Sequence, residues 1–356
     1  MLKRRLLAVA ASLIGALLLS LSAVEAQVFP LKSAHLVSRE KCKVSGALSL
    51  KLDAPNLEAL EWIYYAPYPP DLPEQQKLSS LEMLVDDKPF AYRSQLELSP
   101  LHRKVLLARI PCNSLELKKH LYARVHYFLT LNSKELVQGA AKSLATISAE
   151  EKALYLKPTK SLDFDNQDFQ SWLSKHNLRK ESSEKDIDFA WRTYQKIRRL
   201  YQYNYDPLQN RSASNICKCK SSDCGGLSYL FSSILRANGV AARPLIGRWL
   251  KKSGGADSAD NGYGQVHVKS EFFADSVGWI PVDMSFGVSN PDGDGMAYFG
   301  HFAGDFITFH VDPDVYLDSF WFGKKEFPYL QNPAFWVTGS GNLSGLESKT
   351  YWQTRE

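Results

Sequence analysis

Cys224, His267 and Asp283 have the residue types and the chain order that covalent acyl transfer needs. In such chemistry a cysteine thiolate attacks a carbonyl carbon, a histidine moves the proton, and a carboxylate orients and stabilises the imidazolium. Taken singly, each side chain is better explained by a structural role: a buried thiol, a hydrogen-bonded sheet histidine, a strand-end aspartate. It is their combination, in a suitable local context, that predicts catalysis.

The context of Cys224 is the start of a predicted helix. Asp223 before it is a good capping residue, and Asn238-Gly239 is a typical helix end. A buried stripe of apolar side chains follows helical spacing, at Leu227, Leu230, Phe231, Ile234 and Leu235. The unsatisfied N–H groups and positive dipole end of a helix favour a thiolate there. Gly225 and Gly226 are expected to leave room for a substrate and to offer N–H donors to an oxyanion.

His267 and Asp283 lie in a predicted hairpin. Val240–Trp249 reads as one strand, and the alternation around His267 predicts a second strand with this side chain opposite its two valine neighbours. Residues 275–278 turn the chain, and 279–283 form the next strand. Since a hairpin sets its strands side by side, Asp283 is expected to reach His267.

These blocks resemble the transglutaminase-like superfamily of papain-like cysteine enzymes. The resemblance rests on Asp223-Cys224-Gly225-Gly226 continuing to Arg243, on Val266-His267-Val268, and on Gly278-Trp279-Ile280-Pro281-Val282-Asp283, and it covers about residues 165–310. It implies that Cys224, His267 and Asp283 form a triad, with the cysteine at a helix start and the other two on adjacent antiparallel strands. The sequence looks like an exported bacterial-type member.

The resemblance also implies an upstream polar or aromatic side chain near the oxyanion. Tyr203 and Tyr205 are the candidates, although packing in the core or on the surface would explain tyrosines equally well. The Gly-, Ser-, Ala- and Asp-rich segment 251–264 is predicted to be a mobile lip beside the site.

The fold is predicted to be α+β, with an N-terminal antiparallel β-sandwich before the transglutaminase-like core. Period-two alternation predicts strands at 47–52, 104–110 and 121–130, whereas helical spacing predicts a helix over 186–203. We expect a sandwich domain at 27–155, a catalytic domain at 156–325 and a C-terminal segment at 326–356.

The first residues predict export. Lys3-Arg4-Arg5, the apolar run Leu6–Leu21 and the small-residue site ending at Ala26 match a secretory signal peptide over 1–26, with an uncleaved anchor as the alternative. The expected location is periplasmic or secreted, without stable membrane insertion after cleavage. The net charge of +5 comes from scattered side chains, which does not indicate nucleic-acid binding.

Export makes disulfides possible among the five cysteines. A bridge between Cys42 and Cys112 is predicted in the sandwich, with Cys224 left as a thiol. Cys217 and Cys219 make a poor zinc site without a fourth ligand. A local disulfide, free thiols, and a reversible Cys219–Cys224 bridge that masks the nucleophile remain open as alternatives.

Residues 290–295 read as a turn rather than a calcium loop, so no metal or cofactor is predicted.

The predicted function is cysteine-dependent acyl transfer on amide bonds of proteins or peptides, cell-wall peptides included. Hydrolysis by a protease or amidase and transamidation by a transglutaminase share every step up to the acyl-enzyme, so residue types leave this choice open. The alternative from another class is a non-catalytic module that binds peptide or cell-wall material. A thiol–disulfide protein that uses Cys217 and Cys219 is a weaker alternative.

Overall fold

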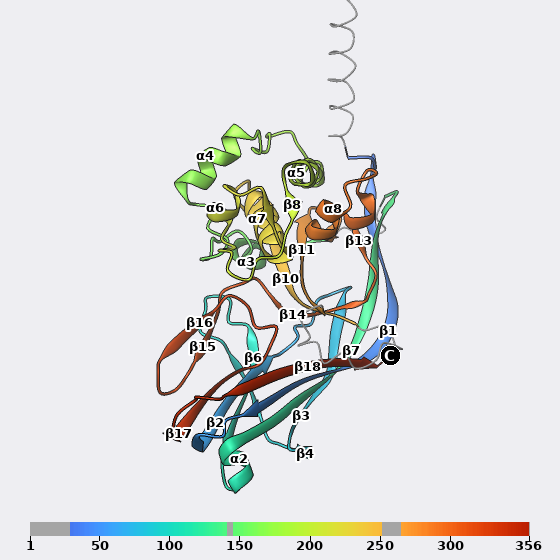
Figure 1. The fold of residues 1–356 in the computed structure, drawn as a ribbon. Helices are drawn as coiled ribbons and strands as arrows, with labels where there is room; N and C mark the ends of the chain where they lie inside the picture. Colours follow the sequence, from blue (N-terminus) through green and yellow to red (C-terminus); the bar gives the residue numbers. More distant parts are fainter. Residues whose placement is uncertain (1–28, 141–144, 251–264, 356) are drawn as a thin grey trace, which may run out of the picture.

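A computed structural model describes residues 29–140, 145–250 and 265–355. The predicted α+β class is confirmed, because a body of mixed helices and strands sits above a β-sandwich (Figure 1). The predicted signal peptide, 1–26, and the predicted lip, 251–264, lie outside the described residues. Within the described ranges, no helix has the length and apolarity needed to cross a membrane.

The sandwich consists of two antiparallel sheets packed face to face. The first sheet has the order β18-β1-β7-β3-β4, with strands β1 (Ala34–Asp53), β3 (Gln76–Val85), β4 (Lys88–Pro89), β7 (His120–Gln138) and β18 (Glu347–Arg355). The second has the order β17-β2-β6-β5, with β2 (Leu57–Pro67), β5 (Arg93–Leu96), β6 (Lys104–Pro111) and β17 (Ala334–Gly341). One apolar core lies between them, with Leu48, Trp62, Tyr64, Leu106 and Val125 among its members.

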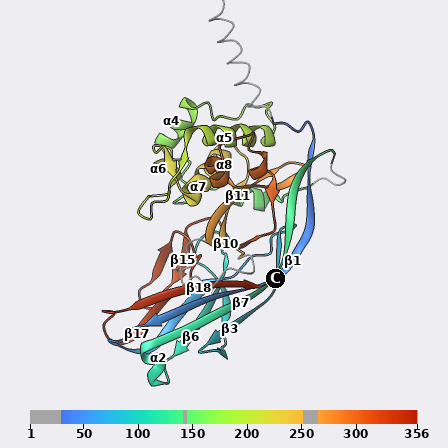
Figure 2. The same ribbon diagram turned by 45° about the vertical axis from the view of Figure 1, so that its right-hand side comes forward.

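Strands β1 and β7 extend beyond the sandwich and connect it to the upper body (Figures 1 and 2). Their pairing runs from Ala34 opposite Gln138 to Asp53 opposite His120. In β7 the predicted alternation is confirmed, because every second side chain from Leu121 to Leu131 is buried. The upper part of β7 pairs with the short strand β13 (His301–Phe302) of the other body, so the two bodies share a sheet.

The end of the chain returns to the sandwich. Residues 326–356, which the sequence pattern set apart as a segment, supply β17 beside β2 and β18 beside β1. Before them, β15 (Val315–Asp318) and β16 (Lys324–Phe327) form a hairpin. Trp352 of β18 is buried against Tyr127 and Phe309, and its Nε1 donates to the carbonyl oxygen of Trp249 at 2.9 Å.

The upper body is built on the antiparallel sheet β12-β11-β10-β14. Its strands are β10 (Ala242–Trp249), β11 (Val266–Ala274), β12 (Gly278–Val282) and β14 (Phe306–Val311). Helix α7 (Cys224–Arg236) packs on one face, and its whole predicted apolar stripe is buried. Helix α5 (Asp186–Leu200) confirms most of the helix predicted over 186–203 and packs against α7, but it ends three residues early, because Gln202 and Tyr203 form a strand. The smaller elements are α2 (Leu115–Lys119), α3 (Ala149–Leu154), α4 (Gln167–Lys175), α6 (Ala213–Ile216), α8 (Met284–Ser289), η2 (Met296–Tyr298), β8 (Gln202–Tyr203) and β9 (Ser221–Ser222).

The opposite face of that sheet meets the sandwich strands through buried charges. Lys134 of β7 donates to the carbonyl oxygen of Trp279 at 2.8 Å and lies 3.9 Å from Glu271 of β11. Arg243 of β10 binds Glu271 at 2.6 Å and stacks over the Trp279 ring at 3.9 Å. Because breaking a buried charge pair is costly, this cluster fixes the relative orientation of the two bodies.

The predicted Cys42–Cys112 disulfide is wrong, since the structure records no disulfide at either cysteine. Cys42 lies opposite Leu131, in the middle of β7. Cys112 lies beside α2, and β7 begins at His120, directly after that helix. At about 3.3 Å per residue, the stretch of β7 between those points spans roughly 36 Å. A disulfide needs Cα atoms within about 7 Å.

We predict that the return of the chain to the sandwich is a main source of stability. Trp352→Ala should lower the free energy of unfolding by about 3–5 kcal/mol, because it empties a site in the shared core. Trp321→Ala is the matched control, since Trp321 is 63% exposed and Trp352 only 3%; it should change the free energy by no more than about 0.5 kcal/mol. Urea unfolding measures both, and equal losses would contradict this account.

Candidate active site

Cys224 is the first residue of α7, as predicted, and it is half-buried. Asp223 caps the helix by accepting the N–H of Gly226 at 3.1 Å. The guanidinium of Arg211 binds both oxygens of Asp223, with its Nε at 3.0 and 2.9 Å. Burial alone would lower the pKa of Arg211, but Asp223 outweighs it and raises that pKa. The cap therefore does not leave an unpaired negative charge beside Cys224.

The two glycines after Cys224 have a different role from the one predicted. A Cβ on Gly226 would lie 2.1 Å from Ser222 Oγ, and one on Gly225 would lie 3.1 Å from Arg211 Cδ. The glycines thus make room for neighbouring protein atoms rather than for a substrate. The N–H of Gly226 is also engaged by the cap, which removes it as an oxyanion donor.

His267 and Asp283 form a buried pair. The Nε2 atom of His267 lies 2.9 Å from Oδ2 of Asp283, and both side chains are buried. Asp283 follows β12 directly and caps α8, where its Oδ1 accepts from Ser285 Oγ at 2.9 Å and from the N–H of Phe286 at 3.1 Å. With both oxygens occupied, the carboxylate has a fixed orientation toward the imidazole.

The environment makes this pair ionic. Burial by itself would lower the pKa of His267, but the Asp283 carboxylate and the Cys224 side chain outweigh it and raise that pKa to about 9. Burial would raise the pKa of Asp283, but His267 and then Lys269 hold it at about 2. A hydrogen bond between the side chains of His267 and Cys224 contributes to the raised pKa. Because Nε2 faces Asp283, Nδ1 is the ring nitrogen left for Cys224.

The structure therefore brings the three predicted residues together on three elements. The hairpin of β11 and β12 has Ser270 opposite Val282, which places Asp283 one residue beyond the pairing and level with Lys269, two residues from His267 on β11. Helix α7 crosses this sheet so that its first residue reaches His267.

Aromatic rings enclose His267, and the sequence did not point to them. The Trp249 ring lies 4.8 Å from the imidazole at 32°, and the Phe286 ring lies 5.4 Å away at 31°. Trp249 and Phe286 also stack on each other at 5.6 Å. Trp249 ends a predicted strand and Phe286 follows the aspartate by three residues, but neither position signals proximity to His267 on its own.

Tyr203 and Tyr205, the candidates for a side chain near the oxyanion, both lie close to Cys224. The strand β8 pairs with β9, just before the cysteine, and sets Tyr203 opposite Ser222. Burial, and then the electrostatic effect of the Cys224 side chain, raise the pKa of Tyr203 to about 12. Tyr203 and Tyr205 remain 45% and 43% exposed, so they form a rim rather than core.

The C-terminal segment supplies a further contact that sequence reasoning missed. The side-chain amide of Gln331 donates to the carbonyl oxygen of His267 at 2.9 Å and to that of Gly247 at 2.8 Å. It thereby ties β11 and β10 to residues that continue into the sandwich. A glutamine 64 positions along the chain carries no local signal for such a contact.

Several other predicted features lie elsewhere. Cys217 Sγ donates to the Ser214 carbonyl at 3.2 Å, and Cys219 Sγ donates to the Asn215 carbonyl at 3.5 Å. The described residues include no cluster of side chains suited to hold a metal. The carbonyls of the turn at 290–295 converge on the guanidinium of Arg198, which takes the place that a cation would have.

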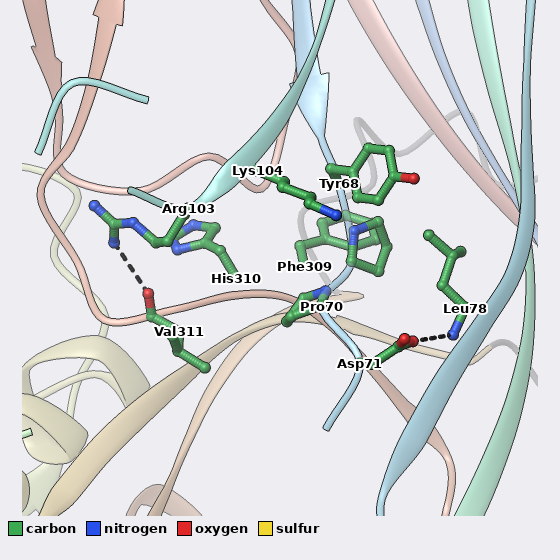
Figure 3. A pocket seen from close by; sticks show the side chains of 10 residues that line it. Tyr68, Pro70, Asp71, Leu78, Arg103, Lys104, Phe309, His310 and Val311 are labelled. Atoms are coloured by element: carbon green, nitrogen blue, oxygen red, sulfur yellow. Dashed lines mark hydrogen bonds between the residues drawn. The ribbon is translucent and has the colours of Figure 1, made fainter. Parts of the chain in front are cut away.

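A cavity of about 340 Å³ lies apart from the triad, beside the proline-rich loop that follows β2. Figure 3 shows Lys104, the Tyr68 ring and Phe309 around it, with Asp71 bonded to the N–H of Leu78. His310 and Arg103 at its edge are engaged with backbone groups. Cys224, His267 and Asp283 are not among the residues that line this space.

Residues 175–284 match the model of the transglutaminase-like superfamily. The chain carries a transglutaminase-like core. The matched residues contain Cys224, His267 and Asp283 and stop one residue into α8.

One solved structure shows the same fold over a longer span. A proposed cysteine protease from Cytophaga hutchinsonii is similar with a TM-score of 0.52 and 10% identity, over 90% of this chain and 92% of that one. The periplasmic domain of TgpA from Pseudomonas aeruginosa is a weaker match, with a TM-score of 0.35 and 15% identity, over 68% of this chain and 93% of that one. A comparison with curated proteins gave no match.

We predict that Asp283 controls the protonation of His267. In Asp283→Asn the burial of His267 remains but the charge that opposes it is gone, so its pKa should fall from about 9 to below its usual 6.5. NMR titration of the imidazole in both proteins measures this. A wild-type His267 that titrates at or below 6.5 would contradict the ionic pair.

The same shift has a stability consequence. A raised histidine pKa contributes stability that is fully present below pH 6.5 and is lost as pH rises through about 9. The lowered pKa of Asp283 contributes stability that is present above pH 3.8 and is lost as pH falls through about 2. Unfolding experiments between pH 6.5 and 9 should show a loss of up to about 3 kcal/mol in the wild type, and Asp283→Asn should abolish it.

Proposed function

We propose that the protein is a cysteine-dependent enzyme that cleaves amide bonds of proteins or peptides through Cys224, His267 and Asp283. The observation that carries the proposal is the buried 2.9 Å pair between His267 and Asp283, with Cys224 at a helix start on the other side of the imidazole. A structural histidine would not need a buried carboxylate on one nitrogen and a thiol at the other.

The proposed reaction has two stages. The Cys224 thiolate attacks the amide carbonyl carbon, and the His267 imidazolium gives its proton to the leaving amine as the C–N bond breaks. Water then loses a proton to His267 and attacks the thioester carbonyl; the C–S bond breaks, which releases the acid and restores the thiolate–imidazolium pair. Asp283 stays ionised throughout and stabilises the imidazolium whenever it forms.

Hydrolysis is the outcome we favour over transamidation. Tyr203, Tyr205 and Phe286 near the triad are each at least 40% exposed, which supports access of water to a thioester on Cys224. The similar structure from Cytophaga hutchinsonii is described as a proposed cysteine protease, which supports peptides as the substrate class. The signal-peptide pattern at 1–26 supports a periplasmic or secreted location, where cell-wall peptides are also within reach.

We predict that iodoacetamide labels Cys224 selectively at neutral pH. Cys112 and Cys217 are internal controls, because burial raises the pKa of each thiol to about 11. His267→Ala should slow the labelling of Cys224 at pH 7 by at least about tenfold, since it removes the proton acceptor and the cation that pairs with the thiolate. Peptide mapping by mass spectrometry measures each site. Labelling that His267→Ala leaves unchanged would remove His267 from the mechanism and favour a binding module.

A further inference from the structure

Lys269 is a buried cation next to the catalytic pair that the mechanism above does not use. It lies two residues after His267 on β11, so the two side chains point to the same face of the sheet. Its side chain is only about 7% exposed, and its Nζ lies 4.0 Å from Oδ2 of Asp283. This oxygen is the one that pairs with Nε2 of His267, so it lies between two cationic groups.

Three aromatic rings hold the ammonium in place. Its Nζ lies 4.1 Å from the ring centre of Trp249, 4.9 Å from that of Phe302 and 5.4 Å from that of Phe306. Ring faces attract a desolvated cation and offset part of the cost of burying it. Trp249 also packs against the imidazole of His267, so the lysine and the histidine share one wall.

The charges around Lys269 leave Asp283 as its main partner. Burial lowers the pKa of Lys269, and the carboxylates of Asp283 and Asp305 oppose that effect. Glu271, the next residue on the same face of β11, is bound to Arg243 at 2.6 Å. Cys224 faces the imidazole of His267. The cation therefore acts on the catalytic pair rather than on a separate surface ion pair.

We propose that Lys269 is a positioning residue, whose ammonium holds Asp283 Oδ2 toward His267 and weakens the hold of that carboxylate on the imidazolium proton. The proposal rests on the proposed function, because it assigns Lys269 a task in the same proton transfer. A carboxylate with no second cation would bind the imidazolium proton more tightly. That would make His267 a poorer acid toward the leaving amine.

The test replaces Lys269 by a neutral side chain of similar length. In Lys269→Met the positive charge beside Asp283 is lost, so the NMR titration of His267 should move upward by about one pH unit. The alkaline limb of the iodoacetamide profile of Cys224 should move in the same direction. Lys269→Arg keeps the charge and should restore the wild-type midpoint to within about 0.3 pH unit.

Lys134→Met is the matched control. Lys134 is also a buried lysine between the two bodies, 1% exposed, but it binds the Trp279 carbonyl and lies near Glu271 instead of Asp283. Its replacement should reduce stability and leave the titration of His267 unchanged.

If Lys269→Met does not fold, Asp305→Asn is the second variant. It removes a negative charge that acts on Lys269, so the midpoint of the His267 titration should move to lower pH.

The outcomes separate this proposal from the proposed function. If His267 titrates at the same pH in Lys269→Met, Lys134→Met and the wild type, Lys269 serves packing alone and the proposal is overturned. The proposal is also overturned if only Asp305→Asn folds and the midpoint of its His267 titration equals that of the wild type. If wild-type Cys224 shows no selective alkylation, the proposed function fails, yet the titration of His267, which needs no reactive thiol, still decides the role of Lys269.

Discussion

The buried ion pair between His267 and Asp283 is the interaction on which the rest of the site depends. Burial opposes both charges, so the pair persists only because its 2.9 Å geometry and the bonds from Ser285 and Phe286 to the other carboxylate oxygen compensate. Such geometry requires rigid supports. The hairpin of β11 and β12 fixes the two residues relative to each other, and α7 packs on the same sheet to bring in Cys224.

The sandwich takes part in this support. Trp352 bonds the backbone of Trp249, whose ring covers His267, and Gln331 bonds the backbone of His267 itself. Lys134 of the long strand β7 adds a buried link to β12 and β11. Residues of the sandwich and of the C-terminal segment therefore support the side of the site opposite α7. The two bodies act as one structural unit.

Local patterns were sufficient for the features that depend on near neighbours. The sequence predicted the capping residue, the apolar face and the C-terminal end of α7. It also predicted the alternating burial along β7 and the hairpin that carries His267. Long-range pairing could not: the predicted Cys42–Cys112 bridge failed because strand length separates its ends. The sequence did not predict that Trp249, Lys269 and Gln331 lie at the site, because long-range packing brings them there and no sequence motif contains them. The sequence pattern predicts space for a substrate at the glycines after Cys224, whereas Ser222 and Arg211 occupy that space.

The central claim is that Cys224 carries the acyl group during turnover. The most direct measurement mixes the protein with an excess of an activated peptide ester, quenches in acid within milliseconds to seconds, and maps the adduct by mass spectrometry. The account predicts a thioester on Cys224 that accumulates, decays to free acid, and is absent in Cys224→Ala. Turnover of the ester with no adduct on Cys224, or equal turnover by Cys224→Ala, would contradict it.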